Sequence, residues 1–221
     1  MIIYSLIPAR KGSKRIKNKN LLKFNKKHLV NITTESSINT KLINKTFVST
    51  NDKKIIKVLD NSVNIINRPE NISTDKSTTE EAIVHFIKFL REKQIKLPNI
   101  IVLLQCTSPL RENNDIKLAI EKFFKGKYDS LFSGCKNKNL FWTKKNKKLI
   151  PLNYMPSKRQ REQKMKNQYL ENGSIYVFKT SGFIKKKCRL FGKIGVYIMK
   201  KQNSLQIDDS EDIEMIKKYY D

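Results

Sequence analysis

Apolar residues along the chain gather in short runs that polar and turn-forming residues separate. Runs with the length of buried strands occupy residues 2–7, 45–50, 63–66, 99–105 and 128–134. Helical stretches lie between them. Residues 78–94, for example, repeat apolar positions at steps of three and four, behind a threonine and two acids that are typical of a helix N-terminus. Strands that alternate with helices predict a parallel sheet covered by helices on both faces.

The last third of the chain has a different pattern. Residues 140–152, "LFWTKKNKKLIPL", predict two short strands around a polar turn, and residues 153–168 are basic, polar and without helical periodicity. Two more strands and a closing helix are expected at 173–178, 195–200 and about 209–220. An excursion from a compact domain is usually a binding loop, a lid or an oligomer contact. We therefore predict one α/β domain over residues 1–221, in which residues 136–168 form a dimerisation or substrate excursion.

The length of 221 residues suits one domain, for which roughly 100–200 residues are typical. No apolar run approaches the roughly 18 residues that a membrane-spanning helix needs. The first ten residues place their charge behind the apolar positions, as a buried strand does and a signal peptide does not. The three cysteines, Cys106, Cys135 and Cys188, are widely spaced and form no CxxC pair. They predict neither a disulfide framework nor a zinc site, and they suit a reducing cytoplasm.

The formal net charge of +26 suggests nucleic-acid binding as one interpretation, because lysine and arginine release counterions from a phosphate backbone. The lysines, however, are spread along the chain and accompany many asparagines and isoleucines, all of which have A/T-rich codons. A single-strand binding surface would need a concentrated stripe of cations with interleaved aromatic residues. A solvated basic surface is the favoured interpretation, and its field would still concentrate anionic small substrates.

The loop "IPARKGSKRIKNKN" at residues 7–20 directly follows the first expected strand. It therefore lies at the carboxyl end of that strand, where open α/β sheets bind their ligands. Gly12 permits a close backbone approach and Ser13 offers a hydroxyl. Charge-assisted donors for phosphate oxygens are Arg10, Lys14, Arg15 and Lys19. The loop matches neither the Walker A pattern nor the dinucleotide-binding turn, so a phosphate loop and an ordinary basic surface turn both remain open on these residues alone.

Further segments resemble a known family. They are "STND" at 49–52, "RPENISTDKSTT" at 68–79, "LLQCTSPLR" at 103–111, "RQ" at 159–160, "NGSIYVF" at 172–178 and "LQIDDSEDIE" at 205–214. Together with residues 7–20, in this order and spacing, they resemble the acylneuraminate cytidylyltransferases, or CMP-sialic acid synthetases, which are relatives of the KDO-activating enzymes. The resemblance covers essentially the whole chain. It implies a Rossmann-like, three-layer α/β/α nucleotidyltransferase fold with a mostly parallel sheet.

The resemblance also implies a reaction. The anomeric hydroxyl of a nine-carbon acidic sugar attacks the α-phosphate of CTP, pyrophosphate leaves, and the product is a CMP-sugar for surface glycans such as lipopolysaccharide or capsule. Cationic donors and Mg²⁺ are expected to offset the charge of the triphosphate. CTP and the acidic sugar are the expected partners, together with a second copy of the chain in a homodimer.

Individual positions match the family's nucleotide site. The residues that the resemblance assigns to nucleotide binding are Ala9, Arg10, Ser13, Arg15, Asn20, Arg68 and Thr79. Catalytic roles are implied for Arg10, Lys19 and Asp208. In the alternative, these residues have only a structural role: the "RP" at 68–69 ends a strand and Thr79 caps a helix.

Other positions match the sugar site. The residues that the resemblance assigns to the sugar are Gln105, Ser108, Arg159, Asn172 and Tyr176. Ser108 could equally serve turn chemistry around Pro109, and Tyr176 could be a core residue, because one face of a strand is buried.

The metal site departs from the family pattern. The family usually has an Asp-Ile-Asp sequence, whereas this chain has Gln206 at the first position and keeps Asp208. A glutamine oxygen can ligate Mg²⁺ but contributes no charge, which makes Gln206 a doubtful ligand. Asp209 should face the other way and is expected to cap the last helix.

Three alternatives remain at this point. A KDO-type cytidylyltransferase is one, although the "KNKN" ending at 17–20 favours the nine-carbon type. An inactive relative that only binds nucleotide is the second, and Gln206 is its best argument. A basic nucleic-acid-binding protein is the third. The sequence does not identify which nonulosonic acid is used.

Overall fold

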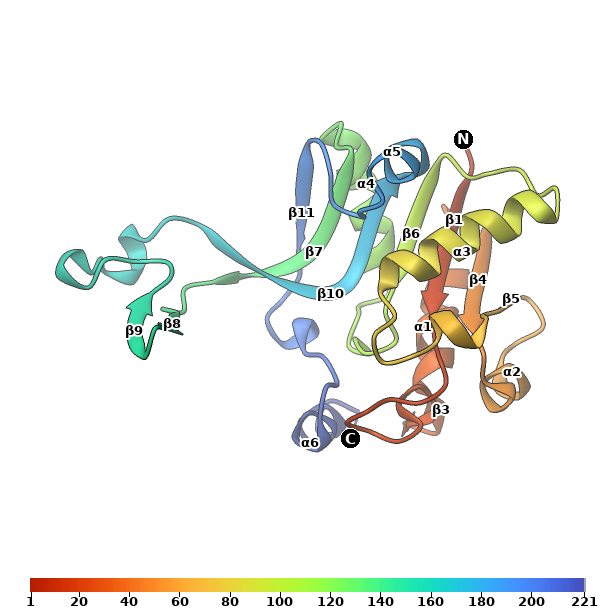
Figure 1. Cartoon of the computed structure of the whole chain (residues 1–221), viewed down its shortest axis with the longest axis horizontal. Coiled ribbons are helices and arrows are strands. Elements are labelled where there is room, and N and C mark those ends of the chain that lie inside the picture. The colour runs from red at the N-terminus through yellow and green to blue at the C-terminus, as the bar shows by residue number, and fades with distance from the viewer. Residues whose placement is uncertain (221) are drawn as a thin grey trace.

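A computed structural model describes residues 1–220, without the side chain of residue 162. At its centre lies a seven-stranded sheet (Figure 1). In spatial order its strands are β11 (Ile194–Ile198), β7 (Ser130–Asn137), β10 (Gln168–Lys179), β6 (Ile100–Leu104), β1 (Ile3–Pro8), β4 (Lys45–Thr50) and β5 (Asn64–Asn67). All neighbours pair in parallel except β10, which runs antiparallel to β6 and β7. The prediction of a mostly parallel sheet is confirmed.

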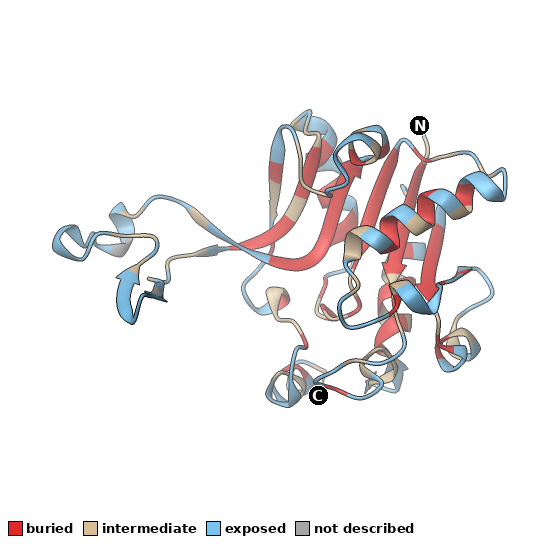
Figure 2. Ribbon diagram, in the orientation of Figure 1, coloured by how far each residue is buried: buried red, intermediate tan, exposed pale blue. Residues whose placement is uncertain are grey.

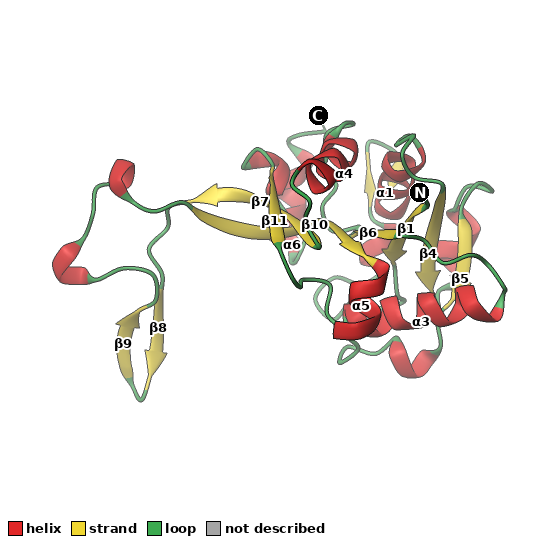
Figure 3. Cartoon of the chain, turned by 90° about the horizontal axis from the view of Figure 1, so that it is seen from above, coloured by secondary structure: helices red, strands yellow, loops and turns green. Residues whose placement is uncertain are grey.

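Helices cover both faces of the sheet, which gives three layers (Figure 3). The α-helices are α1 (Leu29–Ile38), α2 (Lys53–Val58), α3 (Thr79–Glu92), α4 (Asp115–Lys125), α5 (Thr180–Lys186) and α6 (Ser210–Lys217). The 3-10 turns are η1 (Lys19–Leu21), η2 (Glu70–Ile72), η3 (Pro156–Lys158), η4 (Glu162–Lys164) and η5 (Gln202–Ser204). No described helix has both the length and the apolar content that crossing a membrane requires.

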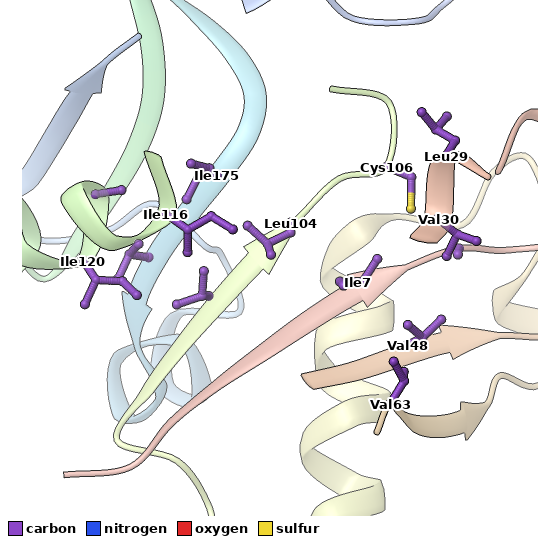
Figure 4. Packing of buried hydrophobic residues seen from close by; sticks show 14 of the residues in the cluster. Ile7, Leu29, Val30, Val48, Val63, Leu104, Cys106, Ile116, Ile120 and Ile175 are labelled. Atoms are coloured by element: carbon purple, nitrogen blue, oxygen red, sulfur yellow. The ribbon is translucent and has the colours of Figure 1, made fainter. Parts of the chain in front are cut away.

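Alternation along the strands divides the core into two clusters, because successive side chains point to opposite faces. Ile3 and Ile7 of β1 join the cluster under α1, α4 and α6, whereas Tyr4 and Leu6 join the cluster under α3 and α5. Figure 4 shows part of the first cluster. Its labelled members include Ile7, Val48 and Leu104 from the sheet, Val30 from α1 and Ile116 from α4.

The helix expected at 78–94 is confirmed as α3. Thr78 is its N-cap, and a capping box joins Thr78 to Glu81, as the sequence of a threonine followed three residues later by an acid indicates. The buried residues of α3 recur at three- and four-residue steps and face the sheet; they are Ala82, Ile83, Phe86, Ile87 and Leu90. These contacts fix the N-terminus of α3 beside the carboxyl edge of the sheet.

Residues between β7 and β10 form an arm that projects from the sheet (Figure 1). The arm carries a hairpin of β8 (Trp142–Lys145) and β9 (Lys148–Pro151), which confirms the two strands expected at 140–152. Most of the arm is exposed (Figure 2). β10 begins at Gln168, five residues before the expected strand, because its first part pairs with the extended end of β7.

Candidate active site

A cavity of about 220 Å³ lies at the carboxyl edge of the sheet, where β1, β5 and β6 end. The end of β1 and the loop after it contribute Pro8, Arg10, Gly12, Ser13, Lys19 and Asn20. The segment between β5 and α3 and the start of α3 contribute Arg68, Ser77, Thr78, Thr79 and Ala82. The loop after β6 contributes Gln105, Cys106 and Thr107. The fold thus brings together predicted site residues from three distant parts of the sequence.

Hydrogen bonds to two backbone carbonyls shape the loop after β1. The amide of Ala9 donates to the Ser49 carbonyl at 2.9 Å, and the Asn20 side chain donates to the Arg10 carbonyl at 3.1 Å. Gly12 has a φ of +72° and leaves open space where a side chain would lie. Ala9 itself is fully buried, so it anchors the loop and does not line the cavity.

Arg10 and Lys19 both line this cavity, and each has one carboxylate beside its charge. Arg10 pairs with Asp75 at 2.7 Å. The Lys19 ammonium donates to the Ile207 carbonyl at 2.7 Å and lies 3.5 Å from a carboxylate oxygen of Asp208. Burial lowers the pKa of Lys19, although the Asp208 charge opposes this shift. Arg15, in contrast, is exposed and lies outside the cavity lining.

Arg68 adds a third cation, and no carboxylate pairs with it among the described residues. Its Nε donates to the Ser49 hydroxyl at 3.0 Å and its Nη2 to the Ser49 carbonyl at 2.8 Å. Burial, and then the neighbouring Arg10, lower the pKa of Arg68 to about 10, and the group remains charged at neutral pH. Three cations that share one cavity provide a site for a multiply charged anion.

The N-terminus of α3 also faces this cavity. Thr78 and Thr79 both line it, and the free backbone N–H groups of a first helical turn favour negative charge. Thr78 is the N-cap and Thr79 the first helical residue, so the alternative of Thr79 as the cap is wrong.

Arg111 fixes the loop after β6. Its Nη1 donates to the Gln105 carbonyl at 2.9 Å, and its Nη2 donates to the Thr33 hydroxyl of α1 at 2.7 Å. Burial lowers the pKa of Arg111 to about 10. Gln105 lines the cavity, but Ser108 is fully buried and donates to the Asn172 carbonyl at 3.4 Å. Ser108 therefore connects this loop to β10.

Cys106 lies beside Gln105 at the cavity wall. Burial raises the pKa of its thiol to about 11, which keeps it protonated and removes any role as a nucleophile at neutral pH.

Asn172 and Tyr176 on β10 do not line this cavity. Asn172 is buried: its Oδ1 accepts from the Ser133 hydroxyl at 2.6 Å, and its Nδ2 donates to the Ser204 hydroxyl at 2.9 Å. Tyr176 is buried in the cluster under α3, as the core alternative proposed. In this geometry both side chains hold β10, and their contact with a substrate stays a prediction.

A charged cluster surrounds Tyr176. Its hydroxyl donates to Glu171, and the Arg189 guanidinium lies 4.6 Å from the centre of its ring. Arg189 pairs with Glu80 of α3 at 2.6 Å. Burial, and then the bond to Glu171, raise the pKa of Tyr176 to about 12.

Arg159 is remote from the other predicted residues. It lies on the arm, in a separate cavity of about 370 Å³ between the residues around Tyr154 and Met165. Within one chain, the arm and the edge of the sheet therefore provide separate groups of predicted residues.

The two residues predicted to bind the metal, Asp208 and Gln206, provide few ligand atoms. Residues 1–220, as described, contain no group of three or more His, Cys, Asp or Glu side chains placed to hold a metal. Asp208 presents one exposed carboxylate beside Lys19, while the Gln206 amide donates to the Asn172 carbonyl. Asp209 caps α6 with Asp212 in a capping box, which confirms the interpretation of Asp209. One carboxylate fits Mg²⁺ that takes its other ligands from phosphates and water.

Sequence reasoning did not assign some lining residues a role. These are Pro8, Ser77, Thr78, Ala82, Cys106 and Thr107. Thr107 and Cys106 directly follow Gln105, so the rule that ligands bind at the carboxyl ends of strands would have found them. The capping box of α3 would have found Thr78.

Comparisons with known proteins show the family and the fold of this chain. A family model described as cytidylyltransferase matches residues 4–221. An N-acylneuraminate cytidylyltransferase of Streptococcus agalactiae serotype III (strain NEM316) is 29% identical over 213 residues, which are 94% of this chain and 50% of that protein. A pseudaminic acid cytidylyltransferase of Campylobacter jejuni subsp. jejuni serotype O:23/36 (strain 81-176) is 25% identical over 97% of this chain and 94% of its own length.

The chain spans about half the length of the first curated relatives that it matches. Among solved structures, a CMP:2-keto-3-deoxy-manno-octonic acid synthetase complexed with CTP superposes with a TM-score of 0.67 at 12% identity, over 99% of this chain and 98% of the other. This likeness confirms the expected nucleotidyltransferase fold.

Proposed function

Because the chain belongs to the cytidylyltransferase family, we propose that it transfers CMP from CTP to the anomeric hydroxyl of a nine-carbon acidic sugar and releases pyrophosphate. The observation that carries this proposal is the cavity at the sheet edge, where Arg10, Lys19 and Arg68 converge beside the N-terminus of α3. The relatives named for N-acylneuraminate and pseudaminic acid support a nine-carbon substrate over a KDO-type one.

In this proposal the loop after β1 holds the triphosphate. Arg10, Ser13 and Lys19 donate to phosphate oxygens, and Asn20 keeps the loop closed through its bond to the Arg10 carbonyl. Donors fixed before the reaction stabilise charge that develops on the phosphates without reorganising. Arg10 and Lys19 are thus the catalytic cations on the protein side.

The base and the sugar occupy the neighbouring walls. Arg68 and Thr79, which line the cavity, would contact the cytosine, and Gln105, which directly follows β6 and also lines the cavity, would contact the sugar. Asp208 would hold Mg²⁺ together with phosphate oxygens, and the metal would supply further neutralisation of the triphosphate.

We propose that a second copy of the chain completes the sugar site. The arm exposes several apolar side chains, among them Leu149, Leu152 and Met155, at 68%, 64% and 66% exposure. Apolar patches of this kind mark interaction surfaces. Arg159 on the same arm would then reach the partner's cavity and bind the sugar carboxylate or the phosphates.

We also propose a single domain over residues 1–221 and a cytoplasmic location. Cys106, Cys135 and Cys188 are all free thiols, which suits a reducing compartment.

Pyrophosphate release tests the reaction. Purified protein receives CTP, Mg²⁺ and, in separate reactions, N-acetylneuraminic, legionaminic, pseudaminic or KDO acid, with UTP and sugar-free reactions as controls. We expect release with CTP and one nine-carbon acid, and its loss in Arg10→Ala and Lys19→Ala. Pyrophosphate release only with KDO would contradict the nine-carbon substrate and support the KDO-type alternative.

An inactive, nucleotide-binding relative is the second candidate, favoured by Gln206 in place of the usual acid. It predicts no release with any acid from folded protein that still binds CTP by calorimetry. Binding of short DNA or RNA at physiological salt, with no affinity for CTP, would instead support the nucleic-acid alternative.

A further inference from the structure

Two glutamine side chains from distant parts of the chain meet at Gly173. A Cβ atom at Gly173 would lie 2.5 Å from Nε2 of Gln206 and 2.9 Å from Oε1 of Gln105. Gln105 directly follows β6 and lines the cavity, whereas Gln206 lies four residues before α6. Only a residue without a side chain leaves room for both amides at this point.

The backbone at Gly173 is shaped for this contact. β10 loses its regular register with β7 between Glu171 and Tyr176, and Gly173 takes a φ of +64° in the interruption. The Ser133 hydroxyl bridges the gap, because it accepts from the Ile175 amide at 2.8 Å and donates to Asn172 Oδ1 at 2.6 Å. The irregular part of β10 is thus held from the β7 side.

Gln206 holds the same irregularity from the other side. Its Nε2 donates to the carbonyl of Asn172, the residue directly before Gly173. This contact requires a donor, since a carboxylate at position 206 would place an oxygen against a carbonyl oxygen. The donor end of the Gln206 amide is therefore used by β10.

The backbone after Gln206 binds the loops after β6 and β1, which both line the cavity. The amide of Ile207 donates to the Thr107 carbonyl at 2.8 Å, and the Ile207 carbonyl accepts from the Lys19 ammonium at 2.7 Å. Ile207 itself is fully buried. This anchoring leaves Gln206 little freedom to turn away from β10.

From these contacts we propose that Gln206 is a positioning residue. By donating to the Asn172 carbonyl it fixes the turn at Gly173, and the turn supports the Gln105 carboxamide from behind at the wall where the acidic sugar would bind. Gln206 acts as a hydrogen-bond donor and not as a metal ligand. The part of this inference that concerns the sugar rests on the proposed function.

The test compares Gln206→Glu with Gln202→Glu. Glutamate keeps the length of glutamine but has no donor, so Gln206→Glu removes the bond to Asn172. Gln202 is exposed on η5, and its replacement adds the same charge four residues away without removing a side-chain bond that the structure shows. Thermal unfolding and calorimetric CTP binding establish that both variants fold and bind nucleotide.

The first readout needs no activity. The side-chain amide signal of Gln105 in a ¹⁵N–¹H NMR spectrum is identified by its loss in Gln105→Glu. We expect this signal to move in Gln206→Glu and to stay in place in Gln202→Glu. An unmoved signal in Gln206→Glu would overturn the proposal, whatever reaction the protein catalyses.

The second readout is kinetic. With the acid that supports pyrophosphate release, Gln206→Glu should raise KM for the acid about tenfold, while KM for CTP and the Mg²⁺ concentration at half-maximal rate stay within about twofold. A lower Mg²⁺ requirement with an unchanged KM for the acid would show a metal position and overturn the inference. If the unaltered protein uses no acid, the proposed function fails, and the NMR comparison still decides the positioning role.

Discussion

Arg10 and Asp75 form a 2.7 Å ion pair that joins the loop after β1 to the loop before α3. Both loops border the cavity, and Arg10 is one of its lining residues. The Asp75 carboxylate is more than half exposed, so it holds the arginine from the solvent side. A triphosphate that binds Arg10 must compete with this carboxylate.

Replacing Asp75 with asparagine should therefore strengthen CTP binding. An exposed ion pair contributes about 0–1 kcal/mol, so the dissociation constant should fall by up to about fivefold. Calorimetry at low and physiological salt measures the change, which should shrink as salt screens the cavity. Asp60→Asn removes an equal charge at an exposed site away from the cavity and should change little. Weaker binding in Asp75→Asn would mean that Asp75 orients Arg10 for the phosphates.

The pKa of Lys19 predicts an alkaline limit for nucleotide binding. Burial holds this pKa below 10.5 in the free protein, and an adjacent phosphate would favour the charged ammonium and raise it. CTP binding should then take up a proton, and affinity should fall as the pH rises from the lowered pKa towards the raised one. Calorimetry in buffers of different ionisation heat measures the proton uptake. In Lys19→Arg the side chain stays charged, so uptake that persists unchanged there would assign it to another group.

The fold could be predicted where periodicity was strong. The buried positions of α3 and the apolar runs of β1, β4 and β6 determine these elements, because each can bury its apolar residues in only one way. The start of β10 could not be predicted, because residues 168–172 are mostly exposed and owe their strand to pairing with β7. That pairing joins residues far apart in the sequence.

The candidate site shows a similar division. Arg10, Ser13, Lys19 and Asn20 were found because they share one loop at a strand end. The partners of Lys19 were not found: the Ile207 carbonyl belongs to a segment 188 residues away, and no local pattern indicates such a contact. Asn172 was expected at the sugar, yet its amide is used by Ser133 and Ser204, since a buried polar group must find partners.

Replacing Gly173 or Gly12 with alanine should lower the free energy of unfolding by different amounts. Both have a positive φ, at +64° and +72°, but only Gly173 has neighbours that a Cβ would strike. Gly12→Ala should cost about 1 kcal/mol, which is the backbone penalty alone. Gly173→Ala should cost about 1–3 kcal/mol more, because Gln206 and Gln105 must move. Urea unfolding of both variants measures the difference. Equal losses of stability in the two variants would show that the side chains of Gln206 and Gln105 move aside at no cost.

The exposed apolar side chains of the arm indicate which substitutions should dissociate a dimer. Leu149, Leu152 and Met155 lie largely in solvent in the single chain, and burial of each would contribute roughly 1.5–3 kcal/mol. Replacing all three with serine should convert a dimer into a monomer at micromolar concentration, as measured by light scattering at physiological salt. Met215→Ser is the control, because Met215 is also exposed, at 49%, but lies on α6 away from the arm.

Pyrophosphate release by the triple variant provides a second test of the proposed dimer. If the partner's arm completes the sugar site, the triple variant should lose pyrophosphate release and keep CTP binding, because Arg10, Lys19 and Arg68 all belong to one chain's cavity. Mixing an Arg159→Ala chain with an Arg10→Ala chain should then restore part of the activity, since one cavity in the mixed dimer receives an intact Arg10 and an intact Arg159. A monomeric unaltered protein with full activity would contradict this arrangement and place the sugar carboxylate on the cations of the sheet edge.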